Sequence, residues 1–174
     1  MKTVGVINGW TAADIIGLLG FGALSYGIVF STAAGIRKLA DYVAGGGFDR
    51  FMLSPKNLLV RVATSSFSVS ALGDIVFGLA CLVIYGLLVQ VSIAQIFLIA
   101  LLVLISIVVF LAAAIAAYSA SFLFTDANSV TSGLFELFMT PSLFHGGAFQ
   151  GATRLVFTFL IPSLVVGALP VEIV

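Results

Sequence analysis

The feature that constrains this chain most is a long uncharged stretch between Asp74 and Asp126. As a single α-helix, its roughly 51 residues would be about 77 Å long, whereas the hydrocarbon core of a bilayer is about 30 Å thick. The stretch must therefore fold back on itself. The amide and hydroxyl side chains of QVSIAQ, residues 90–95, mark the place for a tight hairpin. The sequence thus predicts two membrane-spanning helices, at about 72–89 and 95–122.

The whole chain shares the apolar character of this stretch. Of its 174 residues, 61% are hydrophobic and 8% are charged, whereas a soluble domain usually carries about 25% charged residues. A soluble fold of this size cannot bury so much apolar surface. The sequence therefore predicts an all-α integral membrane protein with a single transmembrane domain over residues 1–174.

Two further segments are long and apolar enough to span a membrane. The first is expected at about 12–36, and the last at about 152–169. Pro162 is expected to kink or end the last helix, because proline lacks an N–H and clashes with the preceding turn. The sequence therefore predicts four spans, with cytoplasmic amphipathic helices between the first two.

The basic residues predict the orientation of these spans. Five of the seven cations lie in residues 37–68, here called the basic segment, and loops rich in Lys and Arg face the cytoplasm. Alternation then places residues 1–11 and the hairpin outside. It places residues 123–151 inside, as an interfacial segment. Arg154 would lie at the inner edge of the last span and Glu172 outside.

Small residues predict close helix packing. They recur in the first and third spans, at Gly17, Gly20, Gly22, Ala23, Gly27, Ala112, Ala116 and Ala120. Small side chains three or four residues apart let helix backbones approach closely in lipid. The pattern fits packing within the chain and also a dimer face between two copies.

Several polar residues are expected to define helix ends. Asp14 and Asp74 lie near the starts of their helices, where the macrodipole favours a carboxylate by about 0.3–1 kcal/mol. Ser70 is expected to cap the helix that contains Asp74. The alternative for Asp74 is a proton or ion site, since carboxylates at membrane depth are often functional. Its place about a turn inside the cytoplasmic boundary favours capping.

The segment 123–151 is expected to hold an interfacial helix. Asp126 or Asn128 can start this helix, and Pro141 is expected to end it. His145 is the one histidine of the chain. It is expected to make a polar contact, because it has no second histidine or cysteine with which to complete a metal site.

The basic segment reads as a series of short helices. Residues 36–43 are expected to continue the first span, and the glycines of AGGG, residues 44–47, to break it. FDRFML forms a short amphipathic piece that Ser54 and Pro55 stop. Asn57 then starts the next piece, in which Arg61 is expected to meet lipid phosphate. The segment is either a docking element for another protein or a lipid-anchoring loop.

The basic segment also resembles the cytoplasmic signature of type-2 ABC transporter permeases, in particular the ABC-2 family transporter proteins. The signature matches at Gly47, Asp49, Met52, Leu53, Pro55 and Asn57, and the late region matches at Pro141, Arg154, Pro162 and Pro170. Ser54 stands where the family has arginine, and Thr140 where it has an aromatic residue. Such permeases have six spans, so the chain is expected to lack one span before Met1 and one after Val174.

The resemblance implies a half-channel that dimerises with a second copy or a paralogue in a prokaryotic plasma membrane. A separate ATP-binding cassette subunit would supply ATP hydrolysis, and the chain itself has no P-loop pattern. Phe48 and Phe51 would fill a groove on that subunit, while Asp49 and Arg50 would fix the register. The full set of expected coupling residues is Gly47, Phe48, Asp49, Arg50, Phe51, Leu53 and Pro55. The resemblance implies no cofactor and no nucleic-acid partner.

Other functions are considered on the same residues. A non-enzymatic membrane scaffold or assembly protein is the main alternative. An intramembrane enzyme would need a nucleophile and a base, paired carboxylates or a metal set at membrane depth. An ion channel would show polar residues along one helix face. The spans are apolar and offer no fixed charge, so the expected substrate is hydrophobic or amphipathic.

Overall fold

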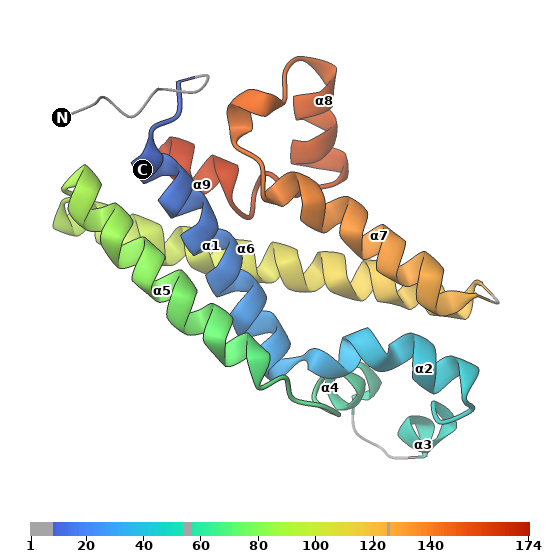
Figure 1. The fold of residues 1–174 in the computed structure, drawn as a ribbon. Coiled ribbons are helices and arrows are strands. Elements are labelled where there is room, and N and C mark those ends of the chain that lie inside the picture. The colour runs from blue at the N-terminus through green and yellow to red at the C-terminus, as the bar shows by residue number, and fades with distance from the viewer. Residues whose placement is uncertain (1–8, 54–56, 125) are drawn as a thin grey trace.

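The computed structural model describes residues 9–53, 57–124 and 126–174, and these residues form helices and turns without strands (Figure 1). Three described helices are long and apolar enough to cross a membrane: Ala12–Thr32, Ser70–Val89 and Ile93–Phe122. They correspond to α1 (Ala12–Thr32), α5 (Ser70–Val89), and α6 (Ile93–Ser119) with its 3-10 extension η2 (Ala120–Phe122). The predicted all-α architecture is confirmed, and the first three spans lie close to their predicted places.

The helix α1 begins at a capping box. Asp14 accepts a hydrogen bond from the Thr11 backbone N–H at 2.8 Å, and its own N–H donates to the Thr11 hydroxyl at 3.3 Å. These bonds satisfy two donors that a helix start leaves open. Asp14 therefore stabilises the helix start, as its position in the sequence predicts.

The chain does not continue α1 into the basic segment, so the prediction for residues 36–43 is wrong. The helix ends at Thr32 and is followed by a 3-10 helix, η1 (Ala34–Lys38), and by α2 (Leu39–Ala44), which runs in a new direction (Figure 1). Gly35 explains the break. A Cβ at Gly35 would overlap the Val62 carbonyl oxygen and the Ser65 hydroxyl, so the close approach of these backbones fixes the bend.

The hairpin between the second and third spans forms at the predicted place. Gln90 closes α5 in the left-handed conformation, with φ 58°. Ser92 then caps α6, and its backbone N–H donates to the Gln95 side chain at 2.8 Å. Gln95 belongs to the first turn of α6, so this helix begins two residues before its predicted start. The Ser-x-x-Gln spacing is the signal for this boundary.

Glycines bring α1 and α5 into close contact. A Cβ at Gly17 would lie 2.9 Å from the Tyr85 ring, one at Gly20 would lie 2.9 Å from Leu82, and one at Gly27 would lie 2.7 Å from the Ile75 nitrogen. The prediction of close packing within the chain is confirmed for these three glycines of α1. It is wrong for Gly22, where a Cβ would meet no atom within 4 Å. In α6, Ala112 and Ala116 are exposed, and the alternative of a dimer face stays a prediction there.

The predicted cap at Ser70 is wrong. Val69 occupies the N-cap position of α5 without a side-chain cap bond, and Ser70 is the first helical residue. The Ser70 hydroxyl lies 3.0 Å from the hydroxyl of Ser68, so it pairs outside the helix. Asp74 lies one turn inside α5, beyond the first-turn N–H groups that it was expected to cap.

The helix α7 (Ala127–Ser142) lies between two contacts with residues that flank α1. In its first turn, the Asn128 amide donates to the Asp41 carboxylate in α2 at 2.8 Å. Just after its last turn, the His145 ring packs edge-on against Trp10, with ring centroids 5.9 Å apart. Asp41 follows α1 and Trp10 precedes it, so the stretch from Asn128 to His145 extends between residues that flank the two ends of α1, while α7 itself packs mainly on α6 (Figure 1). The three described helices that are long and apolar enough to cross a membrane do not include α7, and the interfacial placement of residues 123–151 stays a prediction.

Proline lies at the end of α7, close to its predicted role. Pro141 is in the last turn, and the helix ends one residue later, at Ser142. A proline in that turn removes one backbone hydrogen bond, and helix ends are uncertain by a residue or two.

The single helix predicted at 152–169 is wrong. The chain forms α8 (Ala152–Leu155), a π-helical turn at Val156–Leu160, and α9 (Ala168–Ile173). Ile161 has φ −119° and ψ 81°, as expected for a residue that precedes proline. Pro162 therefore ends the helix early.

An ion pair also contradicts the predicted positions of Arg154 and Glu172. Arg154 pairs with Glu172, whereas the sequence placed these two residues on opposite sides of the membrane. Trp10 is buried with residues of the C-terminal region, including Leu164 and Val171. The C-terminal region thus folds back over the start of α1, and the count of four membrane crossings stays a prediction.

The glycine contact between α1 and α5 leads to a stability prediction. Gly27→Ala is expected to lower the free energy of unfolding by about 1–3 kcal/mol, because its Cβ overpacks against Ile75. Gly73→Ala is the matched control, since a Cβ there meets no atom within 4 Å; it is expected to be neutral or stabilising by up to about 1 kcal/mol. Reversible unfolding in mixed micelles, followed by Trp10 fluorescence, measures both. Equal effects would contradict the packing.

The course of α7 leads to a topology prediction. Ser129 lies in the first turn of α7, Gln150 lies eight residues after its last residue, and both are exposed. In a Cys81→Ala background, Gln150→Cys is expected to react with a membrane-impermeant maleimide in intact cells, as Gln90→Cys should. Ser129→Cys is expected to react only after permeabilisation. Reaction of both sites from one side would contradict a crossing by α7.

Candidate functional site

The basic segment folds into three short helices around a glycine turn. After α2, Gly46 adopts φ 68°, and the Phe48 N–H donates to the Tyr42 carbonyl at 3.0 Å. The helix α3 (Asp49–Met52) follows. Asn57 then caps α4 (Leu58–Ala63), because its side chain accepts from the Leu59 N–H at 3.0 Å. The predicted glycine break and the predicted helix start at Asn57 are both confirmed.

Phe51 lies at the centre of the basic segment. Only 6% of the residue is exposed, and its ring lies 5.1 Å from that of Tyr42. Arg50 and Arg61 place their guanidinium groups 4.9 and 5.6 Å from the Phe51 ring centroid. Such cation–π contacts contribute about 0.5–1 kcal/mol at exposed sites. Phe51 is therefore used inside the chain, and the expectation that it fills a groove on another protein is wrong.

Arg61 also binds within the segment. Its guanidinium donates to the Phe51 carbonyl at 2.6 Å. The side chain thereby joins α4 to the end of α3, and the contact of Arg61 with lipid phosphate stays a prediction.

Phe48 attaches the basic segment to the membrane helices. Its half-buried ring packs edge-on against Phe122 at the end of η2, with centroids 4.9 Å apart. Phe51 lies in the same apolar cluster as Phe30 and Phe110. The segment is thus continuous with the packing of α1 and α6.

The outward face of α3 combines apolar and charged side chains. Leu53 is 87% exposed and Met52 is 59% exposed, and the neighbouring Asp49 and Arg50 are exposed as well. Gly47 is half-buried behind this face. Pro55 lies outside the described residues. Of the predicted coupling residues, Leu53, Asp49 and Arg50 are the ones whose side chains are available to a partner.

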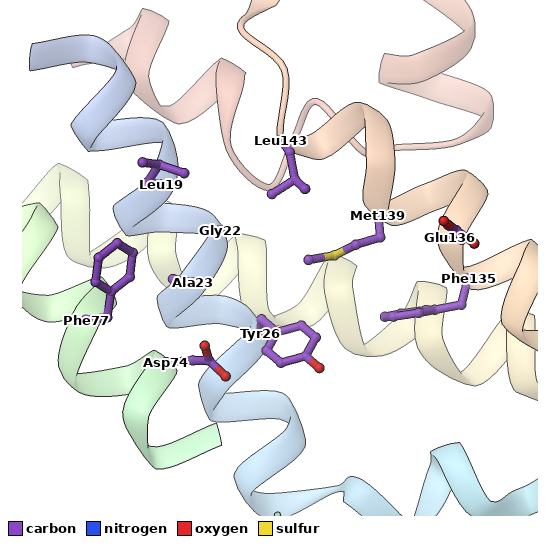
Figure 2. Close-up of a pocket in the computed structure, with 10 residues that line it drawn as sticks. All are labelled: Leu19, Gly22, Ala23, Tyr26, Asp74, Phe77, Phe135, Glu136, Met139 and Leu143. Carbon is purple, nitrogen blue, oxygen red and sulfur yellow. The ribbon is translucent and has the colours of Figure 1, made fainter. Parts of the chain in front are cut away.

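A second candidate site is a pocket of about 520 Å³ between α1, α5 and α7 (Figure 2). Its walls are mainly apolar, and its lining residues are Leu19, Gly22, Ala23, Tyr26, Asp74, Phe77, Phe135, Glu136, Met139 and Leu143. Asp74 extends from α5 toward Tyr26, and Met139 extends from α7 toward α1 (Figure 2). The pocket brings together residues from three helices that are distant in the sequence.

The sequence analysis missed this pocket and its two carboxylates. It treated Asp74 as a helix cap and did not consider Glu136, in the middle of α7, and the structure places both at the pocket. The signal was a lone acid in an apolar run: Glu136 is the one charged residue between Asp126 and Arg154. The expectation of an interfacial helix gave no reason to look for a partner acid on another helix.

The next question is whether the described residues could form a metal site. Residues 9–53, 57–124 and 126–174 contain no group of three or more His, Cys, Asp or Glu side chains that could hold a metal ion. His145 contacts Trp10, and its Nε2 has no hydrogen-bond partner among these residues.

Comparison with known proteins gives the family. The family model described as ABC-2 family transporter protein matches residues 1–174. The chain belongs to the ABC-2 transporter family. This ABC-2 family member is therefore a multi-pass membrane protein and a component of a membrane transport system. No curated protein sequence and no solved structure matches the chain significantly.

The packing of Phe51 leads to a prediction about this ABC-2 family member. Phe51→Ala is expected to loosen the basic segment, because truncating a buried phenylalanine costs about 3–5 kcal/mol. Trypsin cleavage after Arg50 should then become about tenfold faster or more. Leu53→Ala is the control, since Leu53 is 87% exposed, and it should leave the rate unchanged. An unchanged rate in Phe51→Ala would contradict the structural role.

Proposed function

We propose that this chain is the permease subunit of an ATP-driven exporter in a prokaryotic plasma membrane. The observation that carries the proposal is the family match over residues 1–174, and the packing of the basic segment onto the membrane helices supports it. In this proposal, a separate ATP-binding cassette subunit hydrolyses ATP. The permease is non-catalytic and works as a dimer with a second copy or a paralogue. The substrate is hydrophobic or amphipathic.

The outward face of α3 is the proposed docking surface for the ATP-binding cassette subunit. Met52 and Leu53 supply an apolar contact that is costly to leave in water, at about 25 cal/mol per Å². Asp49 and Arg50 supply flanking charges that set the register. The glycine turn and Phe51 position this face without contacting the partner. This assignment differs from the sequence-based expectation in giving Phe51 a structural role.

Two contacts can carry a displacement of this face to the membrane helices. Gly35 lies against the backbone of α4 at the lower end of α1, so movement of the basic segment acts directly on α1. Asn128 and Asp41 join the same segment to the start of α7. Because α1 and α7 form two walls of the pocket, a push on α3 would change the pocket's shape. ATP-driven closure of the partner would in this way open a path for the substrate.

The docking surface leads to a binding prediction. The double variant Met52→Asp and Leu53→Asp is expected to lower association with the ATP-binding cassette subunit at least tenfold, because two exposed apolar contacts become charged. The full-length protein would be tagged, extracted from its own host in mild detergent, and analysed by mass spectrometry for a stoichiometric P-loop protein. Leu123→Asp changes another exposed leucine, 79% exposed after η2, and should leave association unchanged.

The same experiment distinguishes the alternative function. A non-enzymatic membrane scaffold or assembly protein would be recovered without a P-loop subunit, and its basic segment would serve as a lipid anchor. Full association of the double variant would contradict docking on α3. Recovery of the wild-type protein with itself alone would contradict the exporter function.

A further inference from the structure

We propose that the pocket between α1, α5 and α7 binds the transported molecule, and that this molecule is an organic cation with a large apolar body. The proposal rests on the proposed transport function and narrows its substrate class. The pocket of about 520 Å³ is the observation that carries it. Sites for drug-sized ligands usually measure about 300–1,000 Å³ and are mainly apolar, with a few polar groups.

Gly22 of α1 borders the empty space of the pocket. A Cβ added at Gly22 would meet no atom within 4 Å, although Gly17, Gly20 and Gly27 of the same helix lie tightly against α5. Gly22 therefore has a different role from the packing glycines. It leaves room in the pocket, between the side chains of Leu19 and Tyr26 (Figure 2).

The charged residues of the pocket favour a positively charged ligand. Asp74 comes from α5 and Glu136 from α7, so the two acids stand on separate walls (Figure 2). In the described residues, neither acid forms an ion pair, since the described ion pair joins Arg154 and Glu172. The nearby Arg37 donates to the Tyr26 hydroxyl at 3.0 Å and lies over the Phe30 ring. Two carboxylates against this one guanidinium leave the pocket negative.

The aromatic side chains favour the same ligand. Tyr26, Phe77 and Phe135 line the pocket, and the faces of such rings attract a cation that has lost its water. A neutral ligand would remove water from both carboxylates without replacing its interactions, which is unfavourable. An anionic ligand would be repelled. The lining therefore fits a positive centre between apolar or aromatic groups.

The test uses tetraphenylphosphonium, a rigid hydrophobic cation, as the probe. Its saturable binding to the purified full-length protein in nanodiscs would be measured by equilibrium dialysis, with tetraphenylborate as a probe of similar shape and opposite charge. The wild-type protein is expected to bind the cation at least tenfold more tightly than the anion. The double variant Asp74→Asn and Glu136→Gln is expected to lose about tenfold in affinity for the cation, because it removes both charges while keeping side-chain shape.

A second pair of variants tests whether binding requires the empty volume of the pocket beside Gly22. Gly22→Leu fills this volume and is expected to abolish saturable binding. Gly133→Leu is the matched control on α7, because Gly133 also has open space around it but does not line the pocket. It should bind like the wild-type protein, and both variants should show wild-type unfolding of the Trp10 fluorescence signal.

The outcomes separate this inference from the proposed function. Association with the ATP-binding cassette subunit would be measured on the same preparations. Association without saturable cation binding, or with full binding in the charge-neutral variant, would overturn the substrate inference and leave the exporter function intact. Cation binding that requires Asp74, Glu136 and the space at Gly22 would support the pocket even if the partner did not associate. Equal affinity for the anion would overturn the proposed selectivity.

Discussion

The contact between α1 and α5 is the interaction on which the rest of the structure depends. In lipid, apolar side chains gain little by leaving their surroundings, so helix association relies on close van der Waals packing. Gly17, Gly20 and Gly27 allow this approach, because each lies where a Cβ would meet α5 at less than 3 Å. The contact places Asp74 and Phe77 of α5 beside α1 and so builds one side of the pocket.

A second close approach, at Gly35, joins this helix pair to the basic segment. The backbone of α4 lies against η1 there, and Phe51 continues the apolar cluster of Phe30 and Phe110 into the segment. The docking surface and the pocket therefore share one packed scaffold. In the proposed exporter, such continuity would let the ATP-binding cassette subunit move the helices, because a loosely attached segment would move without them.

The position of α7 determines where Glu136 lies. The helix packs on α6, begins at the Asn128–Asp41 contact, and ends beside Trp10. This course places Glu136 between the two ends of the molecule and opposite Asp74. Glu136 is exposed at this place, and Asp74 is half-buried. The chemistry of the pocket is thus a consequence of how α7 crosses the fold.

Local patterns in the sequence determined much of the architecture. Hydropathy over residues 75–125 predicts the two long helices, and QVSIAQ predicts their hairpin, because an apolar run longer than a bilayer must fold back. The glycines before Phe48 and the amide of Asn57 predict the breaks in the basic segment, since both act through the local backbone. The signature around Asp49 and Leu53 also leads to the correct family.

Tertiary structure alone decided the features that depend on distant residues. The break after Thr32 requires α4 to lie against Gly35, and the inward turn of Phe51 requires Arg61 and Tyr42 around its ring. The region after Pro162 folds over α1 in place of a fourth long helix, and hydropathy cannot distinguish these two ways of burying apolar residues. The two carboxylates of the pocket are 62 residues apart in number, Asp74 and Glu136. Only the packing of α5 and α7 around α1 brings them to one site, because no local preference of the backbone relates one acid to the other.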